Sequence, residues 1–333
     1  MPVKSISLSH GSGGALMHGL IRNIFLSRFD NPIIRGLSDS AILPYKEKIA
    51  FTTDSFVVNP VIFPGGDIGK LAVCGSVNDL VVSGARPEFL SLGIIAEEGL
   101  EIGLLEQISD SIAAAARKEK VSIVTGDFKV VEKGACDKIF INTCGVGRVV
   151  KKLPIMNISP HDKVIVSGNV GSHGMAVLSK RKGVDFGFNI KSDCAGLGSL
   201  LLPILAKSNV IKFMRDPTRG GIATTLNEIA RARGLGIVIN EKDIPVSGKV
   251  RAASELLGLD VLYLANEGAA VIIVENAAVA KTLRQLRKHP LGRNARVIGE
   301  VTAKQKGHVI LNTSIGTQRI IDMLAHDPLP RIC

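Results

Sequence analysis

Apolar positions in the first half of the chain follow two spacings in turn. Short runs rich in β-branched and other apolar residues alternate with longer segments in which apolar residues recur every three or four positions. The first pattern predicts strands and the second predicts amphipathic helices. We therefore expect strands at residues 49–53, 88–95, 121–125 and 138–149, a helix capped by Asp67, and a second helix that buries Ile102, Leu105, Ile108 and Ile112.

The pattern divides near residue 155. Pro154 and Pro160 bracket a linker, and residues 163–167 open a second unit of strands and helices. With 333 residues, the chain is long enough for about two domains. We predict an α/β fold divided into a glycine-rich segment at 1–40, an N-terminal domain at 41–154, a C-terminal domain at 155–315 and a tail at 316–333.

Composition narrows the class of protein. Hydrophobic residues make up 46% of the chain, but no apolar run approaches the ~18–20 residues of a membrane span. The N-terminus lacks the apolar core of a signal peptide, so a cytoplasmic protein with no membrane partner is expected. The five cysteines show no CxxC or CxxH spacing, which indicates neither a disulfide framework nor a zinc site.

The net charge of +11 raises the question of nucleic acid. The basic residues are scattered, however, and only 4% of residues are aromatic and able to stack on bases. We therefore predict no nucleic-acid partner. Anionic phosphates or an acidic protein partner explain the charge equally well.

Acidic residues recur where predicted strands and helices end. A single aspartate there usually caps a helix or forms a turn. Several carboxylates that converge repel one another unless a hard cation lies between them, and Mg²⁺ bridging phosphate oxygens is a common solution. The candidates for such a set are Asp39, Asp54, Asp79 and Asp127.

No P-loop accompanies these carboxylates. The segment 65–71 lacks the required spacing, and Leu71 stands where a metal-binding hydroxyl is needed. Glycine clusters at 10–14, 64–67 and 219–221 allow backbone N–H groups to approach phosphate, and the last of them precedes an amphipathic helix at 222–233. Each cluster is also explained by an ordinary tight turn.

The chain ends in Asp327-Pro-Leu-Pro-Arg-Ile-Cys333. Pro328 and Pro330 favour an extended segment, which can carry the sulfur of Cys333 into a distant pocket. The alternative is a frayed terminus, because chain ends are often poorly ordered.

Taken together, these motifs resemble the HypE family of hydrogenase maturation proteins, in the superfamily of aminoimidazole ribonucleotide synthetase and selenophosphate synthetase. The matching stretches run in order through nearly the whole chain, at 10–14, 63–73, 77–80, 126–131, 215–221, 226–230, 265–268 and 328–333. The Pro-Arg-Ile-Cys ending is the most specific of them. Phe128 departs from the family, which usually has a small hydroxyl residue between Asp127 and Lys129.

The resemblance implies a two-domain PurM-like fold. The N-terminal domain would pair with its twin in a homodimer through a β-barrel-like interface and bind ATP nearby. The C-terminal α/β domain would cover the nucleotide, and a flexible C-terminal tail would bring in Cys333.

The implied activity is ATP-dependent dehydration of an S-carboxamide, placed on Cys333 by HypF, to a thiocyanate. Its cyanide would pass to iron on the HypC–HypD complex for [NiFe] hydrogenase. Lys129, Glu267 and His10 would assist catalysis, with Glu267 the first candidate for the base. By resemblance, Asp39, Asp54, Asp79 and Asp127 would hold Mg²⁺, and ATP would contact these four together with Asp67, Asn78 and Gly126.

Two other functions remain open on sequence grounds. One is a superfamily relative such as selenophosphate synthetase or thiamine monophosphate kinase, although the N-terminal cysteine typical of the former is missing because the first cysteine is Cys74. The other is a non-enzymatic cyanide carrier with a vestigial nucleotide site. Without the resemblance, Lys129 would be interpreted as a surface lysine and Glu267 as a helix cap or ion-pair residue.

Overall fold

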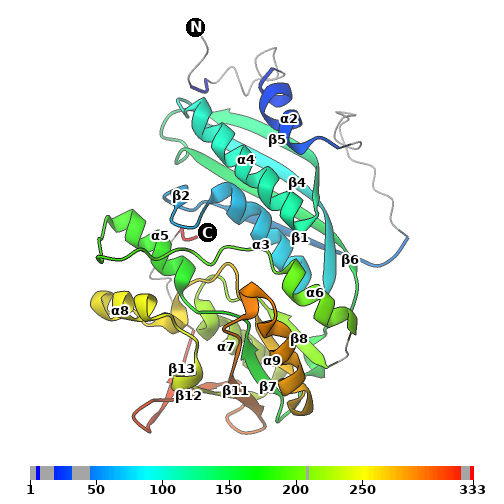
Figure 1. Cartoon of the computed structure of the whole chain (residues 1–333), viewed down its shortest axis with the longest axis vertical. Helices are drawn as coiled ribbons and strands as arrows, with labels where there is room; N and C mark the ends of the chain where they lie inside the picture. The colour runs from blue at the N-terminus through cyan, green and yellow to red at the C-terminus, as the bar shows by residue number, and fades with distance from the viewer. Residues whose placement is uncertain (1–4, 8–18, 32–45, 208–209, 324–330) are drawn as a thin grey trace.

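A computed structural model describes residues 5–7, 19–31, 46–207, 210–323 and 331–333. Within these ranges, no helix combines the length and the apolar character that crossing a bilayer requires. Two sheets, one per domain, account for most of the strands (Figure 1). Near residue 155, where the sequence pattern changes, β6 of the first sheet ends at Val149 and β7 of the second begins at Lys163.

The N-terminal sheet has four strands in the order β1-β6-β4-β5. Its strands are β1 (Ile49–Phe56), β4 (Ala85–Glu97), β5 (Ser122–Val131) and β6 (Ile139–Val149). β6 pairs antiparallel with β1 and β4, whereas β4 and β5 are parallel. All four predicted strands are confirmed, but β1, β4 and β5 extend further than the apolar pattern indicated because their ends carry polar residues.

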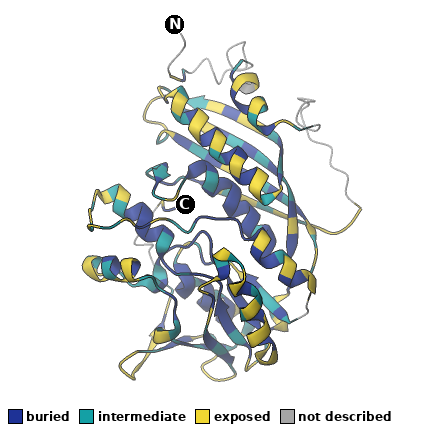
Figure 2. Ribbon diagram, viewed as in Figure 1, coloured by how far each residue is buried: buried dark blue, intermediate teal, exposed yellow. Residues whose placement is uncertain are grey.

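Two helices cover one face of this sheet. α3 (Ile68–Val82) follows the small hairpin of β2 (Ile62–Phe63) and β3 (Gly66–Asp67). The Asp67 side chain accepts a hydrogen bond from the Lys70 N–H at 2.9 Å, which confirms the predicted N-cap. α4 (Ile102–Glu119) buries Leu105, Ile108 and Ile112 of its predicted apolar side, leaves Ile102 half-buried and exposes its charged side to solvent (Figure 2).

No helix within the described ranges covers the other face of the sheet, which we call the outer face. Alternate residues of β1 point outward, and among them Phe51 is 67% exposed and Ile49 is 49% exposed. Ile95 of β4 is also exposed on this face. The domain therefore presents apolar side chains on a sheet face that none of its described helices covers.

Residues before β1 contribute to this domain. The π-helical turn η2 (Ile21–Leu26) and α2 (Ser27–Phe29) contact α4. Phe25 packs against Phe128 with ring centroids 5.6 Å apart, and both rings are buried. The described part of 1–40 is therefore packed onto the N-terminal domain and is not a separate segment.

The C-terminal sheet has seven strands in the order β13-β12-β9-β11-β7-β10-β8. Its strands are β7 (Lys163–Val166), β8 (Ile211–Arg215), β9 (Gly236–Asn240), β10 (Val271–Val274), β11 (Arg296–Thr302), β12 (Val309–Asn312) and β13 (Gln318–Ile321). The sheet continues past the boundary predicted at residue 315, because β13 pairs with β12. Charged and polar residues in β13 concealed the strand from the hydrophobic pattern.

Helices cover both faces of the C-terminal sheet. α7 (Gly221–Arg233) packs on one face with Val164, Val166 and Ile273. The other face carries Ile165 and Ile272 and belongs to the core that includes α5 (Ser172–Lys182), α6 (Gly198–Lys207) and α9 (Val279–Arg287). α8 (Gly248–Leu257) lies beside α5, and single 3-10 turns occur at Ile155–Asn157, Glu241–Asp243, Val261–Tyr263, Asn276–Ala278 and Pro290–Gly292.

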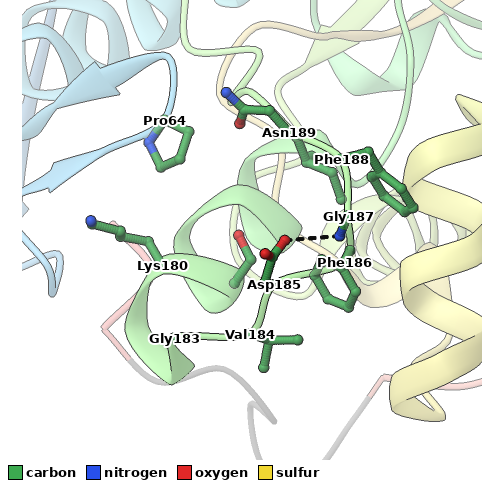
Figure 3. A pocket seen from close by; sticks show the side chains of 11 residues that line it. Pro64, Lys180, Gly183, Val184, Asp185, Phe186, Gly187, Phe188 and Asn189 are labelled. Carbon is green, nitrogen blue, oxygen red and sulfur yellow. Dashed lines mark hydrogen bonds between the residues drawn. The ribbon is translucent and has the colours of Figure 1, made fainter.

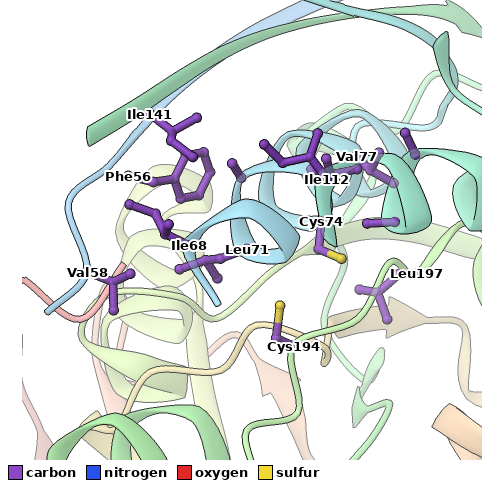
Figure 4. Close-up of a cluster of buried hydrophobic side chains, with 14 of the residues drawn as sticks. Phe56, Val58, Ile68, Leu71, Cys74, Val77, Ile112, Ile141, Cys194 and Leu197 are labelled. Atoms are coloured by element: carbon purple, nitrogen blue, oxygen red, sulfur yellow. The ribbon is translucent and has the colours of Figure 1, made fainter. Parts of the chain in front are cut away.

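One hydrophobic core joins the two domains. It runs from α3 and α4 to α5 and α6 without interruption. Figure 4 shows the sulfurs of Cys74 on α3 and Cys194 in the C-terminal domain pointing toward each other. Because the contact is apolar and continuous, the domains form one packed body around the segment between α5 and α6.

Candidate functional site

Four carboxyl groups come together where the two domains meet, and we call them the inner cluster. Asp54 lies near the end of β1 and Asp79 on α3, while Asp216 follows β8 and Glu267 precedes β10. The Thr52 hydroxyl donates to Asp79 Oδ2 at 2.7 Å. The cluster therefore draws two members from each domain, although they lie far apart in the sequence.

Burial and mutual repulsion raise the pKa values in the inner cluster. Burial raises the pKa of Asp54 to about 6, and the charge of Asp79 adds to the effect. Burial raises the pKa of Asp216 to about 7, with further contributions from Asp79 and Asp54. The Glu267 side chain is buried, which raises its pKa well above the ordinary value, and Asp216, Asp193 and Asp54 add to the shift.

Two arginines oppose this repulsion. The charge of Arg219 lowers the pKa of Asp54, and the charge of Arg215 lowers those of Asp79 and Asp216. Both arginines belong to the segment that leads into α7. Gly220 and Gly221 in this segment have φ of +70° and +60°, a backbone conformation that favours glycine. In addition, a side chain on Gly221 would lie 2.4 Å from the Leu262 carbonyl oxygen.

Asp127 does not join the inner cluster within one chain. In the sheet register Asp127 pairs with Gly93, which pairs with Asn142, which pairs with Ser55. Directly paired residues share a face, so Asp127 and Ser55 lie on the outer face, whereas Asp54 faces α3. Among the described residues, no group of three or more His, Cys, Asp or Glu side chains has the arrangement of a metal site.

Asp127 instead forms an ion pair with Lys129, which we call the outer pair. Lys129 Nζ lies 2.6 Å from Asp127 Oδ1, and both side chains are more than half exposed. Phe128 between them points the opposite way, into the core against Phe25. The unusual aromatic residue is therefore explained by packing, and it leaves Asp127 and Lys129 on the outer face.

The outer pair lines a cavity of about 350 Å³ at the end of β1. Ser55, Phe56 and Val57 form one wall, and Phe140 and Asn142 of β6 form another. The Val57 N–H donates to the Cys333 carbonyl oxygen at 3.1 Å. The last residue of the chain is thus anchored beside the cavity that contains Lys129.

Polar contacts fix the final three residues in place. The Asn59 N–H donates to the Arg331 carbonyl at 3.3 Å, so residues 331–333 run antiparallel to residues 57–59. The Arg331 side chain donates to the Val57 carbonyl at 3.0 Å and to Asp137 Oδ2 at 2.8 Å. Its guanidinium lies 5.7 Å from the centre of the Phe140 ring, and Ile332 is buried.

The structure gives three of the predicted ATP contacts a structural role. Asp67 caps α3. Asn78 is buried and holds the C-terminal domain through its side chain, which donates to the carbonyls of Ala195 and Glu267 and accepts from the Leu197 N–H. A side chain at Gly126 would lie 2.7 Å from the Leu92 carbonyl oxygen, so close strand pairing requires glycine there. His10 and Asp39 lie outside the described residues.

Two polar residues of the site, Asp216 and His173, are not among those that the sequence predicts. Asp216 lies in segment 215–221, whose glycines and family resemblance indicate an anion site but assign no role to the aspartate. An aspartate flanked by two arginines before a Gly-Gly helix start was the available signal. His173, whose Nε2 lies 2.8 Å from the Ile332 carbonyl oxygen, had none, because a single histidine in an apolar segment indicates no particular partner.

A larger cavity of about 520 Å³ lies elsewhere, along residues 183–190 after α5 (Figure 3). The stacked rings of Phe186 and Phe188, with Lys180 and Pro64, line it. Its Asp185 carboxylate accepts from the Gly187 N–H at 2.8 Å and so serves the local turn. Of the predicted site residues that the structure describes, none lines this cavity.

Both domains of this chain match known protein families. The family "AIR synthase related protein, N-terminal domain" matches residues 37–149, and "AIR synthase related protein, C-terminal domain" matches residues 159–312. The carbamoyl dehydratase HypE of Rhodobacter capsulatus is 46% identical over 98% of both chains, and HypE of Escherichia coli is 43% identical over 99% of this chain and 100% of its own length.

Solved structures of HypE proteins are also similar to this chain. A crystal structure of the hydrogenase maturation protein HypE in complex with ATP has a TM-score of 0.95 and 44% identity, covering 98% of this chain and 99% of its own. A HypE–HypF complex matches with a TM-score of 0.81 and 46% identity over 93% of this chain and 100% of that one. The chain thus belongs to the HypE family of carbamoyl dehydratases.

Proposed function

We propose that this protein uses ATP to dehydrate an S-carboxamide on its own Cys333 to a thiocyanate, which supplies the cyanide ligand of [NiFe] hydrogenase. The observation that carries the proposal is the anchoring of Cys333 beside the cavity that contains Lys129. A relative crystallised with ATP supports nucleotide use, and the carbamoyl dehydratase relatives support the reaction class.

The chemistry needs an activated oxygen, because hydroxide is a poor leaving group. We propose that the carboxamide oxygen attacks the γ-phosphorus of ATP, so that the C–O bond later breaks with loss of phosphate. Two N–H protons leave as the C≡N bond forms. The products are the thiocyanate, ADP, phosphate and the released protons, so that the elements of one water are transferred from the carboxamide to ATP.

Glu267 is our candidate base for the N–H protons. A general base works best when its pKa approaches the working pH, and burial moves the pKa of Glu267 in that direction. Lys129 can neutralise charge on the phosphoryl group or on the carboxamide oxygen from the outer face. His10 remains a predicted alternative base.

The inner cluster suits a divalent cation in one respect. Mg²⁺ is commonly held by one or two carboxylates together with substrate phosphates, and Asp54 and Asp79 are two carboxylates whose repulsion a cation would relieve. Bound there, Mg²⁺ would neutralise charge that develops during phosphoryl transfer. Asp39 and Asp127 stay in the proposal as predicted ligands; Asp127 would have to act from the outer face.

We further propose that the protein is a homodimer paired through the outer face. The support is the row of exposed apolar residues, Ile49, Phe51 and Ile95, on a sheet face that no helix of the described ranges covers. Pairing there would bring the outer pair of one protomer close to its partner. The HypE–HypF complex of a relative supports HypF as a partner. HypF as the carbamoyl donor, HypC–HypD as the cyanide acceptor and a cytoplasmic site of action rest on the family resemblance.

Intact-mass measurement tests the reaction. The purified protein is incubated with HypF, carbamoyl phosphate and ATP, and it should first gain the mass of a carboxamide group and then lose the mass of one water. Cys333→Ala should fold and bind ATP but gain no mass. A Cys333→Ala variant that is still modified and still supports hydrogenase maturation would show that the tail is not the substrate.

A non-enzymatic carrier is the alternative. The carrier would hold the cyanide group but show no ATP hydrolysis that depends on the carboxamide. Measuring phosphate release from carboxamide-loaded and unloaded protein separates the two functions.

A further inference from the structure

The end of the chain touches one side chain of the C-terminal domain that is completely buried, that of His173 on α5. Its Nε2 lies 2.8 Å from the Ile332 carbonyl oxygen and its Nδ1 lies 2.8 Å from the Ser192 hydroxyl. Because a carbonyl oxygen only accepts, Nε2 must carry the proton. Burial lowers the pKa of His173 to about 4, so the ring is neutral and Nδ1 accepts from Ser192.

Ser192 begins a short segment, residues 192–195, that is hydrogen-bonded to the loop carrying Glu267. The Ser192 hydroxyl oxygen accepts from the Cys194 N–H at 2.9 Å. The Asp193 carboxylate accepts from the N–H groups of Glu267 and Gly268 at 3.2 and 3.0 Å. The Ala195 N–H donates to the Glu267 carbonyl at 3.1 Å.

Close packing limits the freedom of both parts. A side chain at Gly268 would lie 1.9 Å from the Asp193 carbonyl oxygen, and one at Gly65 would lie 2.8 Å from the Ser192 nitrogen. The Phe63 ring meets the His173 ring edge-on, with centroids 5.3 Å apart. A shift of residues 192–195 would therefore move the backbone at Glu267, because the two segments are closely packed against each other.

We propose that His173 is a positioning residue, which couples seating of Ile332 and Cys333 to the backbone position of Glu267 through residues 192–195. An unseated tail leaves the His173 Nε2–H without its acceptor in a buried site, which costs free energy and loosens the hydrogen bonds that follow. Through this coupling, the carboxyl of Glu267 is held in place only when the tail is seated and the substrate sulfur is present. The inference deepens the proposed function and rests on it for the roles of Cys333 and Glu267.

The coupling is reciprocal by linkage, so it can be tested from either end in unloaded full-length protein. From the tail end, Arg331→Ala removes the side-chain bonds to Asp137 and Val57 and leaves the buried network untouched. Hydrogen exchange should accelerate by about threefold or more at the Cys194, Glu267 and Gly268 amides, as well as at Val57 and Asn59. Arg251→Ala, an exposed arginine on α8, is the matched control and should change none of them.

From the other end, His173→Gln keeps a donor for the Ile332 carbonyl and His173→Leu removes it. Alkylation of Cys333, followed by peptide mass spectrometry, should speed up by about threefold or more in His173→Leu and by less in His173→Gln. Ser192→Ala, a small change beside the same ring, should also speed it up and keeps the test usable if His173→Leu fails to fold.

The proposal is overturned if hydrogen exchange accelerates only where the tail itself binds. If Arg331→Ala accelerates exchange only at Val57 and Asn59, the tail and the Glu267 loop are independent. Neither readout needs dehydration, so they stand even if the proposed reaction is absent. If the wild-type protein does dehydrate, His173→Gln should lower the single-turnover rate without changing the KM for ATP.

Discussion

The two sides of one β-sheet hold carboxylates in opposite environments. On the side that faces α3, Asp54 lies in a desolvated cluster with Asp79, and its pKa is raised to about 6. On the outer face, Asp127 forms an exposed ion pair with Lys129. Because β-strand side chains alternate, a step of one residue decides which environment a carboxylate enters.

The different environments of the inner cluster and the outer pair indicate different chemical roles. Buried carboxyl groups that share a site exchange protons near neutral pH and respond strongly to a cation. An exposed ion pair is screened by solvent and adds little to stability, typically about 0–1 kcal/mol. The raised pKa values of the inner cluster therefore suit the proton transfer that we propose, and the exposure of the outer pair suits reversible contact with a mobile group.

The largest expected effect is that of Glu267→Gln. The substitution removes the candidate base and keeps the side-chain size, so dehydration should slow by about 10²–10⁴-fold. Loading by HypF should persist, and the carboxamide form should accumulate in intact-mass spectra. Glu255→Gln on the exposed side of α8 is the control, and a wild-type rate for Glu267→Gln would remove Glu267 from the mechanism.

A direct test of the two faces compares Asp79→Asn with Asp127→Asn. Both should accumulate the carboxamide form, with Asp79→Asn slower by about 100-fold and Asp127→Asn by about 10-fold, since an exposed partner contributes less transition-state stabilisation. Single-turnover assays over a range of Mg²⁺ concentrations measure this. Equal losses in both variants would show that the faces act as one site.

The inner cluster should also make stability depend on pH. The folded protein binds the Asp216 proton more tightly than the unfolded chain does, with a pKa of about 7 against 3.8. The free energy of unfolding should therefore fall as pH rises from about 4 to 7. Asp216→Asn should be more stable than wild type at pH 8 by about 1–2 kcal/mol and should lose part of this fall.

Denaturant titrations at pH 5 and pH 8, without nucleotide or Mg²⁺, provide the measurement. Identical pH profiles for wild type and Asp216→Asn would contradict the burial argument. The same Glu255→Gln variant should follow the wild-type profile.

The smallest expected effect concerns the tail. ATP with Mg²⁺ should slow alkylation of Cys333 and cleavage after Arg331 by a few-fold, because nucleotide favours the seated state. The ratio of labelling rates with and without nucleotide is the readout. Equal rates would show that the tail seats independently of the nucleotide, without bearing on the reaction itself.

Periodicity predicted the strands and the two main helices of the N-terminal domain, and only the first strand and one helix of the C-terminal domain. The helix capped by Asp67, the strand ending near Asp54 and the division near residue 155 follow from local patterns, because burial of one face imposes its spacing on the sequence. The strand β13 escaped prediction because its residues are mostly exposed, with only Ile321 buried.

The sequence alone determined which chemistry the chain carries, namely clustered aspartates, glycine turns and a terminal cysteine. Only the tertiary structure decided which residues meet. It paired Asp54 with Asp79, added Asp216 and Glu267 from the other domain, placed Asp127 on the opposite face, and seated the chain end against His173. The physical reason is that local spacing fixes the direction of a side chain within its own element, whereas contacts between distant residues depend on how the elements pack.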